Sequence, residues 1–188
     1  MARPWWILKK QTGEPLAVSM AGIKLGDRLL VIGCRDPMLI AQLAAKTGLT
    51  GRGAAVDARE ATVGAAADVA AREGVLLETF TAPWNALPLE SDTFDVVLVR
   101  DVLPHLDAAK RAWCLVEAQR VLRPGGRCLV IDGMSKRGIL PVGRSEPVGS
   151  DYAAAGGAAG ILMAQGFKAA RVLAEREGLV FAEAVKPA

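Results

Sequence analysis

Short aliphatic runs alternate with amphipathic stretches along most of the chain. An aliphatic run without polar alternation is typical of a strand that is buried on both faces, as in a parallel sheet. The stretches between the runs carry apolar residues at helical spacing, and glycine or proline separates the segments. The pattern therefore predicts alternating strands and helices, which build a parallel sheet covered by helices.

The predicted elements follow one another in this alternation along the chain. Strands are expected at Arg28–Gly33, Ala54–Asp57, Val75–Phe80, Phe94–Arg100, Arg127–Ile131, Phe167–Ala174 and Leu179–Val185. Helices are expected from Pro37 to Gly48 and at Ala58–Glu73, Asp107–Leu122 and Asp151–Gln165. The remaining segments are an N-terminal arm at residues 1–27 and loops at Thr81–Thr93 and 133–150.

The last two predicted strands are separated only by the turn Glu175–Gly178. A parallel crossover needs a dozen or more residues, so these two strands must be antiparallel. We therefore predict an α/β fold, a three-layer Rossmann-like sandwich. Its seven-stranded sheet is mostly parallel and ends in a C-terminal antiparallel hairpin.

Composition narrows the class of protein. The chain has 188 residues, of which 52% are hydrophobic, and this fits a single domain with a full core, 1–188. The net charge is +3 and the basic residues are scattered, so no nucleic-acid partner is expected. Cys34, Cys114 and Cys128 lack CxxC spacing and accompany one histidine, so neither a disulfide framework nor a metal site is indicated. Such thiols suit the reducing cytoplasm.

Membrane segments are not predicted. The apolar run Trp5–Leu8 stops at Lys9, well short of the core of a secretory signal. The small and apolar run Ala153–Ala164 is shorter than the roughly 20 residues that a spanning helix needs. Peripheral contact with a membrane remains compatible with the aromatic and basic residues near the N-terminus.

Two segments carry the most specific pattern. FDVVLVRDVLPHL, residues 94–106, reads as a buried strand that ends in a short polar elbow. VLRPGG, residues 121–126, reads as a helix that runs into a Pro-Gly-Gly stop. Together they resemble the class I S-adenosylmethionine (SAM) methyltransferases, in particular the small type 11 branch that includes quinone-biosynthesis enzymes. The resemblance covers nearly the whole chain, from about Gly26 to Val185.

The resemblance is weakest in the loop after the first strand. Members of the family read approximately acidic-x-Gly-x-Gly-x-Gly there, and the glycines let the backbone approach the methionine part of SAM. In this chain Gly33, followed by Cys34, keeps only the first glycine. Val31 replaces the acidic residue, and Arg35 and Pro37 replace the second and third glycines.

The electrostatics of this altered loop disfavour SAM, which carries a sulfonium and an ammonium charge. Val31 removes one negative group and Arg35 adds a positive one, although Asp36 partly offsets it. A side chain at the second glycine also intrudes where only backbone should lie. Two readings remain open: Arg35 points to solvent and the site tolerates it, or the pocket no longer accepts SAM.

Asp57 ends the second predicted strand, about 20 residues beyond the loop. Together with Ala58, it resembles the family's pattern for the carboxylate that accepts hydrogen bonds from the ribose of SAM. Asp57 could instead cap the helix that is predicted to begin at Ala58. Both roles remain open at this stage.

The adenine contact is less well matched. Family members often place an aspartate four residues ahead of a Leu-Pro pair, and Pro83 occupies that position in this chain. Proline offers neither a carboxylate nor an N–H. The adjacent Trp84 could stack on adenine through its ring face, or it could close the hydrophobic edge of the sheet.

His105, the one histidine, falls where quinone-type relatives also have one. It is either a catalytic residue or a hydrogen-bonded structural residue. Methyl transfer scarcely requires it, since a base is needed only when the acceptor must lose a proton. Arg100 and Asp101 lie at the same strand end, as a solvated ion pair or as part of the acceptor site.

Two segments could contact a partner. Trp5 and Trp6 either fold over the sheet edge or form a docking arm for a protein or a membrane surface. Gly156 and Gly160 on the final helix permit close backbone approach, from a partner or from the same chain.

Two functions follow from the resemblance. The first is methyl transfer from SAM to a small-molecule acceptor, and the second is an inactive methyltransferase fold that serves as a binding or assembly subunit. An NAD enzyme is disfavoured, because GxGxxG is missing and a C-terminal hairpin is predicted. The resemblance implies that the residues near the cofactor are Gly33, Cys34, Arg35, Asp57, Ala58, Pro83, Trp84 and Arg100.

Overall fold

A seven-stranded sheet organises the protein. A computed structural model describes residues 15–133 and 150–188, and its sheet has the strand order β3-β2-β1-β4-β5-β7-β6. The strands are β1 Arg28–Ile32, β2 Arg52–Asp57, β3 Glu78–Thr81, β4 Phe94–Arg100, β5 Leu122–Gly133, β6 Lys168–Arg176 and β7 Leu179–Val185. The first five are parallel, and β7 is antiparallel to both β5 and β6. The predicted fold class is confirmed.

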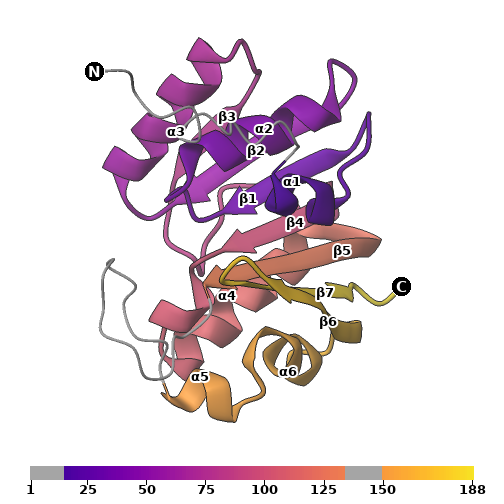
Figure 1. The fold of residues 1–188 in the computed structure, drawn as a ribbon. Helices are drawn as coiled ribbons and strands as arrows, with labels where there is room; N and C mark the ends of the chain where they lie inside the picture. Colours follow the sequence, from indigo (N-terminus) through magenta and orange to yellow (C-terminus); the bar gives the residue numbers. More distant parts are fainter. Residues whose placement is uncertain (1–14, 134–149) are drawn as a thin grey trace, which may run out of the picture.

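Helices cover both faces of the sheet, which makes three layers (Figure 1). One face carries α1 Leu16–Ala21, α2 Pro37–Thr47 and α3 Glu60–Arg72. The other face carries α4 Ala108–Val121, α5 Ser150–Ala154 and α6 Gly157–Ala164. The 3₁₀ turn η2 Leu103–His105 joins β4 to α4. In the described parts of the chain, no helix is both long and apolar enough to cross a membrane.

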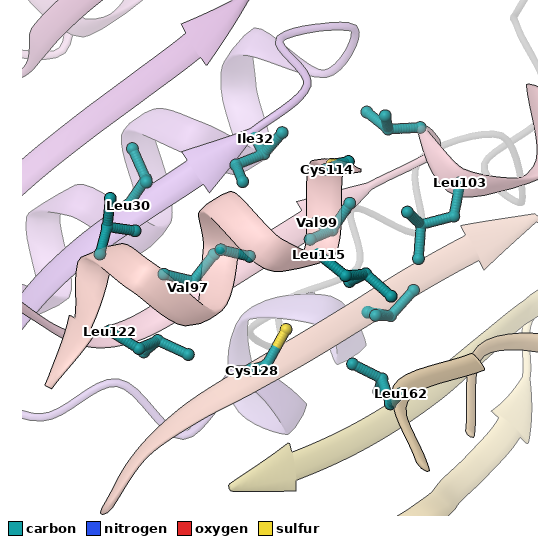
Figure 2. Packing of buried hydrophobic residues seen from close by; sticks show 14 of the residues in the cluster. Leu30, Ile32, Val97, Val99, Leu103, Cys114, Leu115, Leu122, Cys128 and Leu162 are labelled. Atoms are coloured by element: carbon teal, nitrogen blue, oxygen red, sulfur yellow. The ribbon is translucent and has the colours of Figure 1, made fainter. Parts of the chain in front are cut away.

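Alternation along the central strands explains why both layers are needed. On β4, Val97 and Val99 face the α4 and α6 side, whereas Val96 and Leu98 face α1 and α2. Figure 2 shows the first of these clusters, in which Leu115 and neighbouring residues of α4 lie over the sheet. A strand that is apolar on both faces can be stable only between two such layers.

The element boundaries differ from prediction at β3 and β5. The strand expected at Val75 begins only at Glu78, because the Val75 N–H donates to the carbonyl of Ala70 and closes the end of α3. The Pro-Gly-Gly segment does not separate α4 from the next strand. It is an irregularity inside β5, where the Gly125 N–H donates to the Lys186 carbonyl and the Lys186 N–H donates to the Gly126 carbonyl.

Two further expectations need correction. The arm predicted at residues 1–27 contains helix α1, which buries Ala17, Val18 and Ala21 against the sheet. Helix α1 has only six residues, so its apolar residues do not repeat often enough to give a recognisable helical pattern. Trp5 and Trp6 lie outside the described residues.

The helix predicted at Asp151–Gln165 is broken into α5 and α6. Gly156 has φ +83°, a left-handed conformation that ends α5. A Cβ on Gly160 would lie 2.1 Å from the carbonyl oxygen of Ala155, so this glycine lets the two short helices approach closely. Gly156 and Gly160 therefore allow close packing between α5 and α6 of this chain.

The loop after β1 is fixed by a close contact with the end of β4. Gly33 has φ +99°, and a Cβ on it would lie 2.4 Å from the Arg100 carbonyl oxygen and 2.7 Å from Val102 Cγ2. The first glycine of the altered loop is thus required by the packing of this chain itself. It positions the ends of β1 and β4 against each other.

This packing predicts that Gly33→Ala destabilises the protein by more than about 2 kcal/mol. A left-handed backbone alone costs about 1–2 kcal/mol for a residue with a Cβ, and the clash with Arg100 adds to that cost. Gly64→Ala is the matched control, because Gly64 lies inside α3 with no atom within 4 Å of an added Cβ. It should stabilise by up to about 1 kcal/mol. Urea unfolding of both variants measures the difference, and equal midpoints would contradict the packing argument.

Candidate functional site

The candidate site lies at the carboxyl ends of the parallel strands. The chain leaves β1 toward β2 on one side, while β4 lies on its other side, so the strand order reverses between β1 and β4. Open α/β sheets bind ligands in the crevice outside such a switch point. Gly33, Asp57 and Arg100 all lie at this edge, as the sequence predicted. Within residues 15–133 and 150–188, no cluster of histidine, cysteine and carboxylate side chains could hold a metal ion.

Asp57 joins the loop after β1 to the loop after β2. Its Oδ2 accepts a hydrogen bond of 2.8 Å from the Cys34 N–H, and its Oδ1 accepts one of 3.0 Å from the Arg59 N–H. The guanidinium of Arg59 lies 3.5 Å from the same Oδ1. Asp57 is only 1% exposed. A carboxylate can accept about four hydrogen bonds, so lone pairs remain for a further donor once the loop admits one.

The alternative interpretation, that Asp57 caps the following helix, agrees only partly with the structure. Helix α3 begins at Glu60 rather than at Ala58, and the residue ahead of it, Arg59, makes no side-chain cap. Asp57 instead orders the backbone just before the helix, through the Arg59 N–H. Ala58 lies between them and is exposed at the site edge.

The altered loop folds without strain at its substituted positions. Arg35 is exposed, in agreement with the reading that it points to solvent. Asp36 accepts the Leu39 N–H at 3.2 Å and thereby caps α2, and Pro37 occupies the first turn, where its missing N–H costs nothing. Burial, reinforced by the negative charge of Asp57, raises the pKa of the Cys34 thiol to about 12. This thiol is therefore not a nucleophile near neutral pH.

Pro83 and Trp84 follow β3. The Ala82 N–H donates to the Asp57 carbonyl at 3.1 Å, and this bond brings the segment to the same edge of the sheet. Pro83 is exposed, and Trp84 is half-buried against the core cluster that faces α4. The structure thus gives Trp84 the edge-closing role. Its stacking on adenine stays a prediction.

Arg100 and Asp101 are not a solvated ion pair, and this expectation is wrong. The Arg100 side chain is only 11% exposed, and its Nη1 lies 2.6 Å from Asp101 Oδ2 and 3.1 Å from the Ile131 carbonyl oxygen. Asp101 has φ +49° and holds the end of β5, because its Oδ1 accepts the Gly133 N–H at 2.8 Å. A non-glycine residue in this backbone region is strained, and such strain often marks functional sites.

Sequence reasoning missed a buried group beside this pair. Asp132, in β5, is 3% exposed, and its Oδ2 accepts a short hydrogen bond from the Tyr152 hydroxyl on α5. Arg111 on α4 stacks over the Tyr152 ring at 5.2 Å and forms two hydrogen bonds with Asp151, of 2.7 and 3.2 Å. Its Nε also donates to the Leu103 carbonyl at 2.9 Å. These bonds fasten α5 to the end of β5 and to α4, and they fasten α4 to the turn η2.

A signal for Asp132 was present in the sequence. The residue ends the aliphatic run CLVID and lies one residue before the end of β5, whereas Asp57 is the last residue of β2. A carboxylate at the end of a buried strand does not contribute to an apolar core, so it is a candidate residue for a functional site. Burial raises the pKa of the Asp132 carboxyl to about 7, although the Tyr152 hydrogen bond and the Arg100 charge oppose this shift.

His105 lies in η2, at the same edge. Its backbone N–H donates to the Val102 carbonyl at 3.1 Å, and its side chain is exposed. The neighbouring Leu103 and Pro104 are buried and anchor the turn. A catalytic role for His105 stays a prediction.

Residues 30–130, more than half of the chain, match the family model described as "Methyltransferase domain". The chain belongs to this methyltransferase family. Among curated proteins it is similar to the ubiquinone/menaquinone biosynthesis C-methyltransferase UbiE of Chromobacterium violaceum, with 30% identity over 118 residues. That alignment covers 61% of this chain and 46% of the relative, so the chain spans about half the length of the curated relatives it matches.

Solved structures support the fold of this family member. A SAM-dependent methyltransferase from Aquifex aeolicus matches with a TM-score of 0.74 and 21% identity, over 90% of this chain and 87% of that one. The [4+2]-cyclase SpnF matches with a TM-score of 0.67 and 16% identity, over 92% of this chain and 78% of that one. At these identities the likeness establishes the fold, and the chemistry must be argued from the site.

The raised pKa of Asp132 predicts a pH-dependent stability. Its unfolded-state pKa is about 3.9, so the folded protein holds a proton that the unfolded chain has lost between about pH 4 and 7. The contribution of Asp132 to the free energy of unfolding should therefore fall by up to about 1.4 kcal/mol per pH unit as the pH rises through this window.

Asp132→Asn should remove this dependence, because the amide does not titrate and its oxygen still accepts from Tyr152. Urea unfolding at intervals from pH 5 to 8 compares the variant with the wild type. The wild type should lose stability relative to the variant up to about pH 7 and no further beyond about pH 8. Parallel curves across the whole range would show that Asp132 titrates normally.

Proposed function

We propose that the protein binds SAM at the carboxyl edge of β1, β2 and β4 and transfers its methyl group to a small-molecule acceptor. The observation that carries this proposal is the position of Asp57. In a chain of the methyltransferase family, its carboxylate joins the loops after β1 and β2 beside the strand-order switch. A carboxylate in this place accepts hydrogen bonds from a ribose diol in Rossmann-like folds.

The residues of this edge fit the nucleoside half of SAM. Asp57 would accept from the ribose, Cys34 and Ala58 would border it through their backbone, and Trp84 would close the adenine side. SAM supplies a methyl group already activated on sulfur, so the protein mainly has to orient the reactants and exclude water. Asp57 is buried, and the loop carrying Cys34 must move to expose it.

The residues around the expected position of the methionine half of SAM fit that half less well. Val31, at the position of the family's acidic residue, is 1% exposed and packs in the core against α2. It cannot offer a negative group to the SAM ammonium. Asp101 and Asp132 are the carboxylates that the structure places at the same edge, on the side of β4 and β5. Asp101 is paired with Arg100, and burial raises the pKa of Asp132 to about 7, so neither carboxylate fully replaces the negative charge that the first strand lacks.

The family match and the closed but intact Asp57 edge favour the enzyme over an inactive assembly subunit. We further propose that the acceptor is a small molecule and that the protein acts in the cytoplasm. Cys34, Cys114 and Cys128 are buried and unpaired by disulfides, which suits a reducing compartment. A protein partner that contacts Trp5, Trp6 or α6 stays a prediction.

Calorimetry with SAM and with S-adenosylhomocysteine tests the proposal. Asp57→Ala should weaken binding of either ligand by about 10- to 150-fold, since a hydrogen bond to a charged group contributes about 1.5–3 kcal/mol. Asp68→Ala is the control, because Asp68 is an exposed aspartate on α3 away from the site, and its affinity should equal that of the wild type.

Circular dichroism must show that the Asp57 variant is folded, because Asp57 also holds two backbone N–H groups. A folded Asp57→Ala variant with unchanged affinity would remove Asp57 from the site. No binding by the wild type at millimolar ligand would overturn the proposed function itself.

A further inference from the structure

Leucine side chains protrude from the loops ahead of β1, β2 and β3. Leu25, Leu49 and Leu76 are 81%, 93% and 79% exposed, the three highest values for a large hydrophobic side chain in the described parts of the chain. In Figure 1 these loops lie at the ends of the strands opposite to the arrowheads, and so opposite to the candidate site. Single exposed leucines are ordinary, whereas exposed apolar residues that gather on adjoining loops mark an interaction surface. We call these three side chains the leucine edge.

Direct contacts hold the first two loops together. The Gly26 N–H donates to the Thr47 carbonyl at 2.8 Å, which joins the loop ahead of β1 to the end of α2. A Cβ on Gly48 would lie 2.7 Å from Leu25 Cδ2, so the Leu25 side chain lies against the start of the loop that carries Leu49. Leu25 and Leu49 therefore belong to one surface.

The third loop joins the other two at β2. A Cβ on Gly53 would lie 3.4 Å from the Leu76 carbonyl oxygen, so the loop ahead of β3 packs closely beside the start of β2. Strands β1, β2 and β3 are neighbours in the sheet, and neighbouring strands lie about 4.8 Å apart. The sheet thus presents the three leucines side by side at its amino end.

Basic residues surround the leucines. Segments 24–28, 46–52 and 72–78 carry an excess of positive charge: Lys24, Arg28, Lys46, Arg52 and Arg72 against Asp27, Glu73 and Glu78. The Glu78 carboxylate is neutralised by Arg52, whose Nη2 lies 2.7 Å away. Lys24, Arg28 and Arg72 are exposed. The leucine edge therefore combines protruding apolar side chains with a net positive rim.

These features fit a lipid bilayer better than a protein partner. Protein interfaces hold their anchors in well-packed pockets, and lysine is depleted there. Acyl chains fill the space around separate protruding side chains, and anionic headgroups attract lysine and arginine. We propose that the leucine edge docks the protein on an anionic phospholipid membrane, with the leucines among the acyl chains and the basic residues at the headgroups.

Docking at this edge leaves the candidate site open. The leucines and the site lie at opposite ends of the same strands, and the five-residue β1 spans roughly 16 Å between them. The site then faces the aqueous phase while the amino end of the sheet contacts the membrane. The inference therefore does not rest on the proposed function, and membrane binding and SAM binding are separable.

Sedimentation of the full chain with phospholipid vesicles tests the proposal. The protein should bind vesicles that mix phosphatidylcholine with phosphatidylglycerol and should not bind phosphatidylcholine alone. Salt should weaken the binding, because it screens the charges. Leu49→Ala should weaken it about 10-fold, since most of the inserted hydrocarbon is lost, and adding Leu25→Ala should weaken it further. Met163→Ala is the control, because Met163 is 67% exposed on α6 and should not contribute.

The basic rim is tested on the same mixed vesicles. Lys24→Gln and Arg28→Gln should each weaken binding about 5-fold, the loss expected for one basic residue at an anionic surface. Lys168→Gln is the control, because Lys168 is an exposed lysine on β6, at the far edge of the sheet. SAM affinity should equal that of the wild type in all these variants, so failure of the membrane proposal leaves the proposed function intact.

Four results would overturn the inference. The first is a wild type that does not bind the mixed vesicles, and the second is undiminished binding by the variant that lacks both Leu25 and Leu49. The third is a lower melting temperature of Leu49→Ala, which would show that Leu49 packs within this chain. The fourth is a wild-type dimer without vesicles that Leu49→Ala dissociates in analytical ultracentrifugation, which would show that a second copy covers the leucine edge.

Discussion

The hydrogen bond from the Cys34 N–H to Asp57 is the interaction on which the carboxyl edge of the sheet depends. It joins the loop after β1 to the end of β2, while Gly33 packs against the Arg100 carbonyl at the end of β4. Three strand ends are thereby locked around one buried carboxylate. The same bond keeps Asp57 covered, so ligand binding and loop movement are coupled at this point.

A second group of carboxylates organises the other half of the edge. Asp101 holds the end of β5 through the Gly133 N–H, and Asp132 holds α5 through the Tyr152 hydroxyl. Carboxylates thus lie at the ends of β4 and β5, whereas β1 carries the buried and apolar Val31.

Most of the fold could be predicted from the sequence, because strands such as Phe94–Arg100 are apolar on both faces and a connection as short as that between β6 and β7 allows only antiparallel pairing. The boundaries of β3 and β5 could not be. They depend on long-range pairing, of Glu78 with Ala54 and of the Gly125–Gly126 segment with the C-terminus, which no local pattern records. Helix α1 was missed because its stability comes from burial against the sheet.

The site was predicted to the extent that it follows strand ends. Gly33, Asp57 and Arg100 lie where the pattern placed them, but their environments do not follow from spacing. Arg100 was expected in solvent, and only the ladder contact with Ile131 shows why it is buried. Asp132 is hydrogen-bonded to Tyr152, which lies 20 residues away on α5, and no sequence motif indicates this partner.

The central claim is that a SAM-type ligand engages the carboxylate that now binds the Cys34 N–H. The most direct measurement is a titration of the ¹⁵N-labelled protein with S-adenosylhomocysteine, followed at the backbone amides of Cys34 and Arg59. The account predicts saturable shifts at both amides, because both donate to Asp57. Both amides unmoved at millimolar ligand, or shifts confined to another edge of the sheet, would contradict it.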